Sequence, residues 1–119
     1  METLSRNALT FRLLYPHQHI QQVITKMAHQ INTYYAHLQQ QQQSLDLVLV
    51  CILKGAFMFF SDLVKEITHS HTCEFIKCRS YEGFESTGSV MFALEPKAED
   101  FAGKNVLLVD DIHDTGRTL

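Results

Sequence analysis

Apolar residues recur along this chain in two different rhythms. Between Ile20 and Leu38 they return every three or four positions, which is typical of one face of an amphipathic helix. A second stripe with the same spacing covers residues 57–67. Unbroken apolar runs at 45–53 and 106–109 are instead typical of short strands that are buried on both faces. The pattern therefore predicts an α/β fold in which mostly parallel strands alternate with helices.

Shorter stretches add weaker signals. Residues 9–13 alternate between apolar and polar types, which favours a short edge strand. Residues 73–81 and 90–94 are strand-like and are separated by a polar loop with two glycines at 82–89. Such a hairpin is either an ordinary surface feature or a flexible lid. The glutamine-rich run at 39–43 is predicted to fray the end of the first helix into a loop.

Composition narrows the class of protein. With 119 residues, of which 45% are apolar, the chain is expected to form a single domain, residues 1–119. The net charge of −3 argues against general binding to nucleic acid or to an anionic membrane. No apolar run is long enough to span a bilayer, and the N-terminus lacks the apolar core of a signal peptide. Three cysteines without paired spacing indicate reduced thiols and a cytoplasmic location.

The densest chemistry lies at the end of the chain. Asp110 and Asp111 directly follow the strand 106–109, at the edge of an open α/β sheet where ligands bind. They are either a solvated strand end or ligands for a metal ion or sugar hydroxyls. A polar loop, 114–118, then opens a predicted helix, whose free N–H groups attract anions.

One residue of this loop does not suit a phosphate site. Gly116 allows the main chain to approach a ligand closely, and Thr115, Arg117 and Thr118 supply donors. Asp114 carries a negative charge, so it would repel a phosphate. It is therefore either the N-cap of the helix or a residue with a separate chemical task.

Three motifs together carry a family resemblance. Residues 109–119 resemble the phosphoribosyl-diphosphate motif of type I phosphoribosyltransferases, in particular the 6-oxopurine (hypoxanthine) branch. Upstream, Lys54 and Gly55 resemble the pyrophosphate loop of that family, in which the peptide bond before the Lys is often cis. Ser80 and Tyr81 are similar to the Ser-Tyr pair of its flexible, lid-like loop. The three motifs occur in the family's order.

The resemblance implies a fold and a reaction. The fold is a mostly parallel sheet flanked by helices, with a flexible lid hairpin. The reaction belongs to purine salvage: with Mg²⁺, the phosphoribosyl group of phosphoribosyl diphosphate is transferred to hypoxanthine or guanine. The products are IMP or GMP and pyrophosphate. We also expect the chain to form a homo-oligomer.

The resemblance also assigns roles by position. Lys54 and Gly55 would meet the diphosphate, and Ser80 and Tyr81 would close over the site. Asp110 and Asp111 would bind the ribose hydroxyls and Mg²⁺. Asp114 would exchange a proton with the purine N7. The 5′-phosphate would be bound by Thr115, Gly116, Arg117 and Thr118. The family more often has Glu at position 110 and an apolar residue at 113, where this chain has Asp and His.

The resemblance covers only part of the family's fold. In the family, further strands and the residues that contact the purine lie beyond the position of Leu119. We therefore expect an incomplete domain that binds phosphoribosyl diphosphate without turning over purine, or an inactive fragment, as the alternative to an active enzyme. One sheet face is expected to be bare, which favours oligomers. The preferred purine is not decided by the sequence.

Two other interpretations are weaker. An apolar strand that ends in two acids also resembles a Walker B element, but the chain has no G-x-x-x-x-G-K-[ST] loop. His69, His71 and Cys73 alternate and could share one face of a strand as zinc ligands. Cys78 falls on the opposite face and no fourth ligand is evident, so an ordinary strand is the favoured interpretation there.

Overall fold

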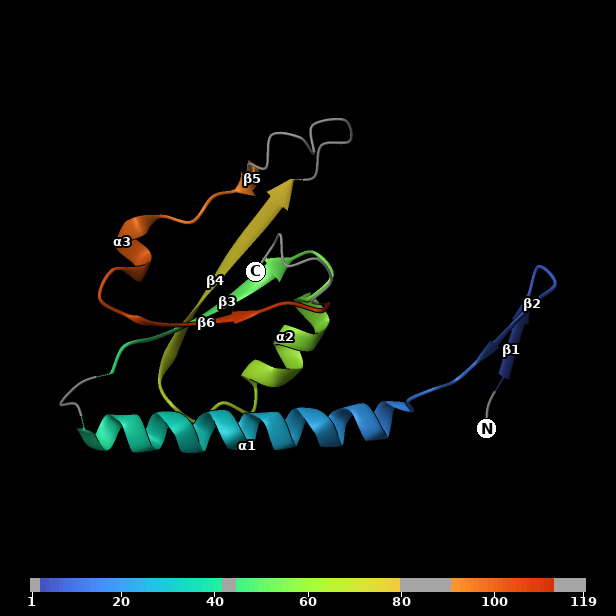
Figure 1. Ribbon diagram of the computed structural model, residues 1–119, viewed down its shortest axis with the longest axis horizontal. Helices are drawn as coiled ribbons and strands as arrows, with labels where there is room; N and C mark the ends of the chain where they lie inside the picture. The colour runs from blue at the N-terminus through green and yellow to red at the C-terminus, as the bar shows by residue number, and fades with distance from the viewer. Residues whose placement is uncertain (1–2, 42–44, 80–90, 113–119) are drawn as a thin grey trace.

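The computed structural model of the chain describes residues 3–41, 45–79 and 91–112. Its centre is a four-stranded sheet in the order β5-β4-β3-β6 (Figure 1). Parallel neighbours β4 (His71–Arg79) and β6 (Asn105–Val109) flank the central strand β3 (Leu47–Leu53). Strand β5 (Met91–Leu94) pairs antiparallel with β4. The predicted α/β fold with a mostly parallel sheet is confirmed, including the return strand at its edge.

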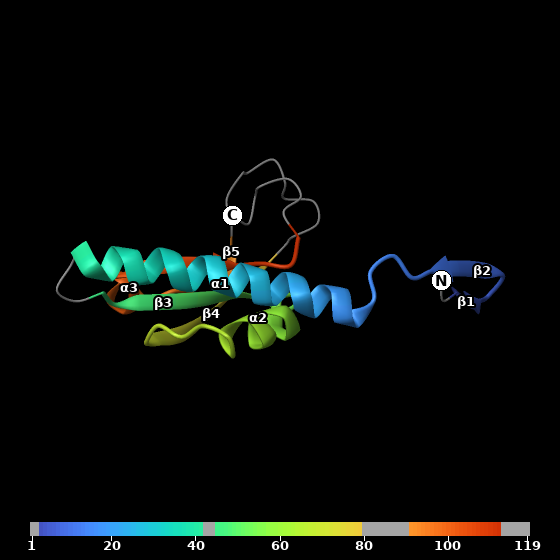
Figure 2. The same ribbon diagram turned by 90° about the horizontal axis from the view of Figure 1, so that it is seen from below.

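In the described ranges, three helices accompany the sheet: α1 (His17–Gln41), α2 (Phe57–Val64) and the short α3 (Ala98–Phe101). Helix α1 runs along one face of the sheet (Figures 1 and 2). The sequence interpretation of its end was wrong in part, because residues 39–41 remain helical. Glutamine has a straight side chain and a good intrinsic helix propensity, so nothing in this run stops the helix.

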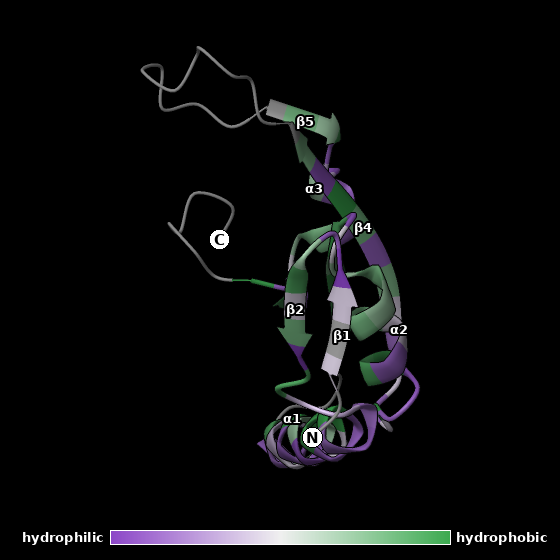
Figure 3. Ribbon diagram, turned by 90° about the vertical axis from the view of Figure 1, so that its right-hand side faces the viewer, coloured by the Kyte–Doolittle hydropathy of each residue, from purple (hydrophilic) through white to green (hydrophobic). Residues whose placement is uncertain are grey.

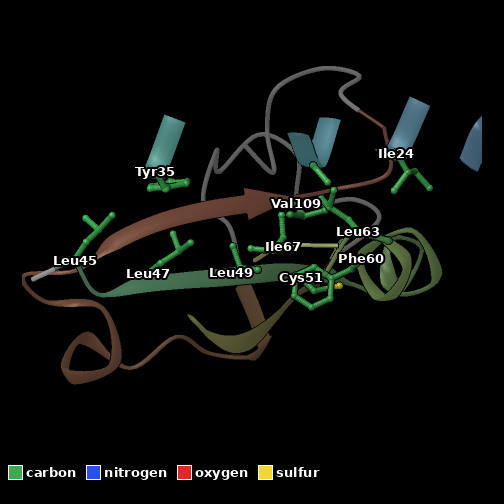
Figure 4. Close-up of a cluster of buried hydrophobic side chains, with 12 residues drawn as sticks. Ile24, Tyr35, Leu45, Leu47, Leu49, Cys51, Phe60, Leu63, Ile67 and Val109 are labelled. Atoms are coloured by element: carbon green, nitrogen blue, oxygen red, sulfur yellow. The ribbon is translucent and has the colours of Figure 1, made fainter. Parts of the chain in front are cut away.

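The larger part of the core lies between the sheet and helices α1 and α2. Leu47, Leu49 and Cys51 alternate along β3 toward this face, where they meet Ile24 of α1 and Phe60 of α2 (Figure 4). All five are buried. Apolar side chains that recur every two residues in the strand and every 3.6 residues in the helices thus meet in one apolar layer.

The residues of β3 between these point to the opposite face. Val48 and Val50 are fully buried there, in a smaller cluster with Ile76 and the half-buried Phe101. A strand that is buried on both faces explains why β3 is apolar at every position.

Polar contacts fix α1 against α2 and the residues that follow it. Gln21 Nε2 donates to Asp62 Oδ2 at 3.1 Å. Asn32 donates from Nδ2 to the carbonyl oxygen of Glu66, and its Oδ1 accepts the N–H of Thr68, both at 2.9 Å. These bonds position the segment that leads from α2 into β4.

An N-terminal hairpin precedes α1. Strands β1 (Thr3–Arg6) and β2 (Leu9–Arg12) are antiparallel and are joined by a two-residue turn at Asn7 and Ala8, both with positive φ. The predicted edge strand at 9–13 is therefore confirmed as β2, and its partner is β1. The hairpin stands apart from the sheet beyond the start of α1 (Figures 1 and 2). Within the described ranges, no helix has the length and apolar character needed to cross a bilayer.

Candidate functional site

The candidate site lies at the carboxyl edge of the parallel strands. Because β3 and β6 run in the same direction, the residues that follow them emerge side by side. Strand β3 leads into Lys54 and Gly55, which precede α2, and β6 leads into Asp110 and Asp111. Lys54 and Asp111 are exposed, and Asp110 is half-buried.

The two loops touch at Gly55. A Cβ atom added to Gly55 would lie 3.0 Å from Cγ of Asp111 and closer still to Oδ2 of that side chain. Real Cβ atoms do not approach other atoms so closely, so a larger residue at position 55 would displace the carboxylate. The close approach of the loop to Asp111 thus depends on the absence of a side chain at this position.

Backbone donors orient the two carboxylates. The N–H of Asp111 donates to Oδ1 of Asp110 at 2.8 Å, and the N–H of Ile112 donates to Oδ1 of Asp111 at 2.9 Å. Neither of these bonds uses Oδ2. The arrangement places two hard oxygen donors at the sheet edge.

The loop between β3 and α2 has a second distinctive feature. The peptide bond between Leu53 and Lys54 is cis, as the resemblance led us to expect. The carbonyl oxygen of Lys54 accepts the N–H of Phe57 at 3.2 Å, so α2 begins directly after the loop.

Two thiols close to Asp110 were not assigned to the site from the sequence. Burial raises the pKa of Cys51, and the negative charge of Asp110 raises it further. The same two causes, in the same order, raise the pKa of Cys78. The sequence placed these cysteines 27 residues apart. Only the order of the strands brings both of them near one carboxylate.

A second lysine also reaches this edge. Lys77 of β4 lies opposite Leu53 in the strand ladder, next to the Lys54 loop. The sequence alone gave no reason to single it out. A predicted strand order, with β4 beside β3, would have identified it.

The carboxylate pair suits a magnesium ion. Mg²⁺ in proteins is commonly held by one or two carboxylates together with substrate phosphates and water, and not by a closed protein cage. Asp110 and Asp111 match that donor set. No group of three or more His, Cys, Asp or Glu side chains that could hold a metal ion occurs within the described residues.

The weak zinc interpretation gains no support from the geometry. His69 Nε2 lies 3.2 Å from the carbonyl oxygen of Leu45, and His71 Nδ1 lies 2.7 Å from the carbonyl oxygen of His69. Each ring therefore has a nitrogen in a structural hydrogen bond. Cys73 is a free, half-buried thiol of β4.

Seven residues predicted for the site lie outside the described residues. They are Ser80, Tyr81, Asp114, Thr115, Gly116, Arg117 and Thr118. The structure thus brings together Lys54, Gly55, Asp110 and Asp111, and the other predictions stay predictions.

Comparison with known proteins gives the family. The phosphoribosyl transferase domain family matches residues 13–119. Hypoxanthine phosphoribosyltransferase from Escherichia coli K12 is 36% identical over 110 residues. Hypoxanthine-guanine-xanthine phosphoribosyltransferase from Tritrichomonas foetus is 33% identical over 108 residues.

These alignments cover most of this chain and part of each relative. The shares are 92% of this chain and 59% of the E. coli protein, and 91% and 55% for the T. foetus protein. The chain therefore spans somewhat less than three fifths of the length of these curated relatives.

Solved structures with a similar fold belong to the same family. A hypoxanthine-guanine phosphoribosyltransferase from Bacillus anthracis superimposes with a TM-score of 0.73 at 30% identity, covering 91% of this chain and 60% of that one. Hypoxanthine phosphoribosyltransferase from Trypanosoma cruzi gives a TM-score of 0.76 at 32% identity, covering 90% and 56%.

Proposed function

The chain belongs to the phosphoribosyltransferase family, and from this premise we propose that its sheet edge binds phosphoribosyl diphosphate for transfer to a 6-oxopurine. The observation that carries the proposal is the contact between Gly55 and Asp111. It joins the proposed diphosphate loop to the proposed ribose-binding acids, so one extended substrate could reach both. The three motifs and the relatives' names support the same substrate.

Each described residue has a task in this proposal. The backbone N–H groups at Lys54 and Gly55 bind the diphosphate, and the Lys54 side chain adds positive charge. Asp110 and Asp111 orient the ribose through its hydroxyls. Loss of pyrophosphate builds positive charge on the sugar, as in glycoside hydrolysis, and the nearby carboxylates stabilise that charge.

Mg²⁺ would be held by Asp110 and Asp111 together with the substrate, where it would offset the charge of the departing pyrophosphate. In the same proposal, Thr115, Gly116, Arg117 and Thr118 hold the 5′-phosphate. Asp114 exchanges a proton with the purine N7, which as general acid–base catalysis is typically worth about 10²- to 10⁴-fold in rate. Ser80 and Tyr81 close the site against water, since water would hydrolyse the reactive sugar.

The proposed reaction is a purine salvage step. Hypoxanthine or guanine would receive the phosphoribosyl group, giving IMP or GMP and pyrophosphate. The E. coli relative is named for hypoxanthine and the T. foetus relative for hypoxanthine, guanine and xanthine. We further propose a cytoplasmic location, because free thiols such as the three cysteines of this chain are typical of reducing compartments. We also propose that the chain self-associates.

Calorimetric titration of the 119-residue chain with phosphoribosyl diphosphate, with and without Mg²⁺, tests the proposal. We expect binding that is strengthened by Mg²⁺. Asp111→Asn should weaken it because a charged ligand of the ribose and metal is lost, and Gly55→Ala should weaken it because the new methyl group displaces Asp111. Asp46→Asn is the matched control, since Asp46 is an exposed carboxylate at the opposite end of β3.

Circular dichroism of each variant verifies that it is folded. A folded wild-type chain that does not bind the ligand would refute the proposed site. Equal affinity of Asp111→Asn and wild type would refute the role of that carboxylate. A parallel assay of purine-dependent pyrophosphate release distinguishes binding from turnover.

A further inference from the structure

Lys77 lies at the same sheet edge as the candidate site, but on the other side of the Lys54–Gly55 loop from Asp111. In the strand order β4-β3-β6, the central strand β3 leads into this loop (Figure 1). Asp111 follows β6 on one side and lies against Gly55. Lys77 belongs to β4 on the other side, where it pairs in register with Leu53. The loop is therefore flanked by a carboxylate residue and by a lysine.

The pattern of β4 shows on which face of the sheet Lys77 lies. Phe75 and Lys77 are two residues apart in this strand, so their side chains share one face. The ring of Phe75 contacts that of Phe60 in α2, with the ring centroids 5.7 Å apart. Lys77 therefore lies on the face that α2 covers.

Helix α2 brings its N-terminus close to Lys77. The helix begins at Phe57, directly after the loop, and runs back along the sheet from there. Phe57 precedes Phe60 by three residues, a distance of about 4.5 Å along a helix. Lys77 lies two residues beyond Phe75 toward the same edge, which is about 6.6 Å along a strand. The first turn of α2 is therefore the part of the helix nearest to Lys77.

The neighbours of Lys77 in the sheet are apolar. Its partners on the adjacent strands are Leu53 in β3 and Leu94 in β5. Lys77 is half-buried, and lysine stems commonly lie along apolar neighbours while the charged end extends into water. The β4–β5 ladder is also irregular between Lys77 and Cys78. Such bulges are frequent next to active sites, where they change the direction of a side chain.

These groups make the loop attractive to an anion. The first turn of α2 has no acidic residue, and the free N–H groups of a helix start attract negative charge. Lys54 in the loop and Lys77 beside it add two positive charges. An anion that lies on the loop is therefore attracted by the helix start and by both lysines.

We infer that Lys77 binds the diphosphate group of phosphoribosyl diphosphate, on the side of the loop that faces away from Asp111. The inference rests on the proposed function and adds to it one residue, which comes from β4. In that function the 5′-phosphate is held by residues that follow β6, and β3 lies between β6 and β4. Lys77 therefore acts on the diphosphate end of the substrate and not on its 5′-phosphate end.

Calorimetric titration of the 119-residue chain with two separate probes, pyrophosphate and ribose 5-phosphate, each with Mg²⁺, tests the inference. Lys77→Met keeps an unbranched apolar stem and removes the charge. We expect it to weaken pyrophosphate binding about tenfold, because a charge-assisted hydrogen bond is lost, and to leave ribose 5-phosphate binding unchanged. Lys77→Arg should restore most of the affinity for pyrophosphate, since a guanidinium group also binds phosphate oxygens.

Lys104→Met is the matched control. Lys104 is an exposed lysine directly before β6, at the amino end of the sheet. The same loss of charge at this distant position should change neither affinity. Circular dichroism of each variant verifies that it is folded.

The outcomes separate this inference from the proposed function. A wild type that binds neither phosphoribosyl diphosphate nor pyrophosphate would overturn both. A wild type that binds both ligands, with a Lys77→Met variant of equal pyrophosphate affinity, would overturn the role of Lys77 alone. Equal weakening of binding to pyrophosphate and ribose 5-phosphate, or no rescue by Lys77→Arg, would also overturn it, because the residue would then act through the fold and not on the diphosphate.

Discussion

At the residue scale, Gly55 and Cys51 each shape the surroundings of the two acids at the carboxyl edge of the sheet. Gly55 lets the loop after β3 lie against Asp111, and a side chain at position 55 would displace the Asp111 carboxylate. Cys51, a buried residue of β3, places a thiol close to the half-buried Asp110. Asp110 therefore lies between solvent on one side and the apolar core on the other.

The thiol of Cys51 makes stability depend on pH on the alkaline side. Its pKa in the folded chain is raised, first by burial and then by Asp110, above the ordinary value of 9.0. As pH rises above that value the unfolded chain loses the thiol proton first, so the folded state binds more protons and the free energy of unfolding falls. Below that value the thiol is protonated in both states and this contribution is fully present.

Urea unfolding from about pH 7 to about pH 10 measures this effect. We expect the wild type to lose stability in the alkaline part of the range, and Cys51→Ala to lose less. Cys73, Cys78 and Tyr35 also have raised pKa values, so the difference between the two proteins isolates Cys51. Identical alkaline slopes in the two proteins would contradict the assignment.

At the element scale, α1 is held in two different ways. Its buried stripe packs on the sheet, as Ile24 and Tyr35 show in Figure 4. Its flank toward α2 is fixed by hydrogen bonds, and Asn32 makes two of them to the segment that leads into β4. The apolar contacts supply most of the stabilisation, whereas the polar contacts set the position of the helix along its axis.

Asn32→Ala should destabilise the fold by about 1–3 kcal/mol, because the N–H of Thr68 and the carbonyl oxygen of Glu66 both lose their partner. Asn32→Asp should cost less, since the carboxylate still accepts from Thr68. Thr33→Ala changes an exposed neighbour and serves as the control. Chemical denaturation measures the free energy of unfolding of the three variants. An Asn32→Ala variant as stable as the control would show that these hydrogen bonds make no net contribution to stability.

At the scale of the whole molecule, the chain consists of a compact body and a separate hairpin. The β1–β2 hairpin is exposed along β2, whose apolar residues are visible in Figure 3. Leu9 and Phe11 share one of its faces and are both exposed. A two-stranded hairpin has little stability of its own in water, so this element takes little part in holding the body together.

Deleting residues 1–12 should therefore leave the free energy of unfolding of the body nearly unchanged, within about 0.5 kcal/mol. Thermal and urea unfolding of the shortened chain, monitored by the helical signal of α1 and α2, measures this. A large loss of stability would show that the hairpin supports the body after all.

The local pattern of the sequence determined the kind of elements and much of their extent. The 3.6-residue period predicted α1 and α2, and the apolar runs predicted β3 and β6, because each pattern reports how one element buries its own side chains. The motifs predicted Lys54, Gly55, Asp110 and Asp111 as candidate site residues, and the structure brings these four together at one sheet edge. The prediction of a frayed helix end was wrong at residues 39–41, because the good helix propensity of glutamine outweighs the low complexity of the run.

Only the tertiary structure decided which elements are neighbours. The order β5-β4-β3-β6 sets Gly55 against Asp111, Cys78 near Asp110 and Lys77 opposite Leu53, pairs that are distant in sequence. Among the described strands, β6 has β3 as its one neighbour, and Val106 and Leu108 are exposed. Strand order is set by contacts between distant parts of the chain, and a strand's own hydrophobic pattern is the same whichever neighbour covers it. The sequence therefore supplied the residues of the candidate site, and long-range packing supplied their arrangement.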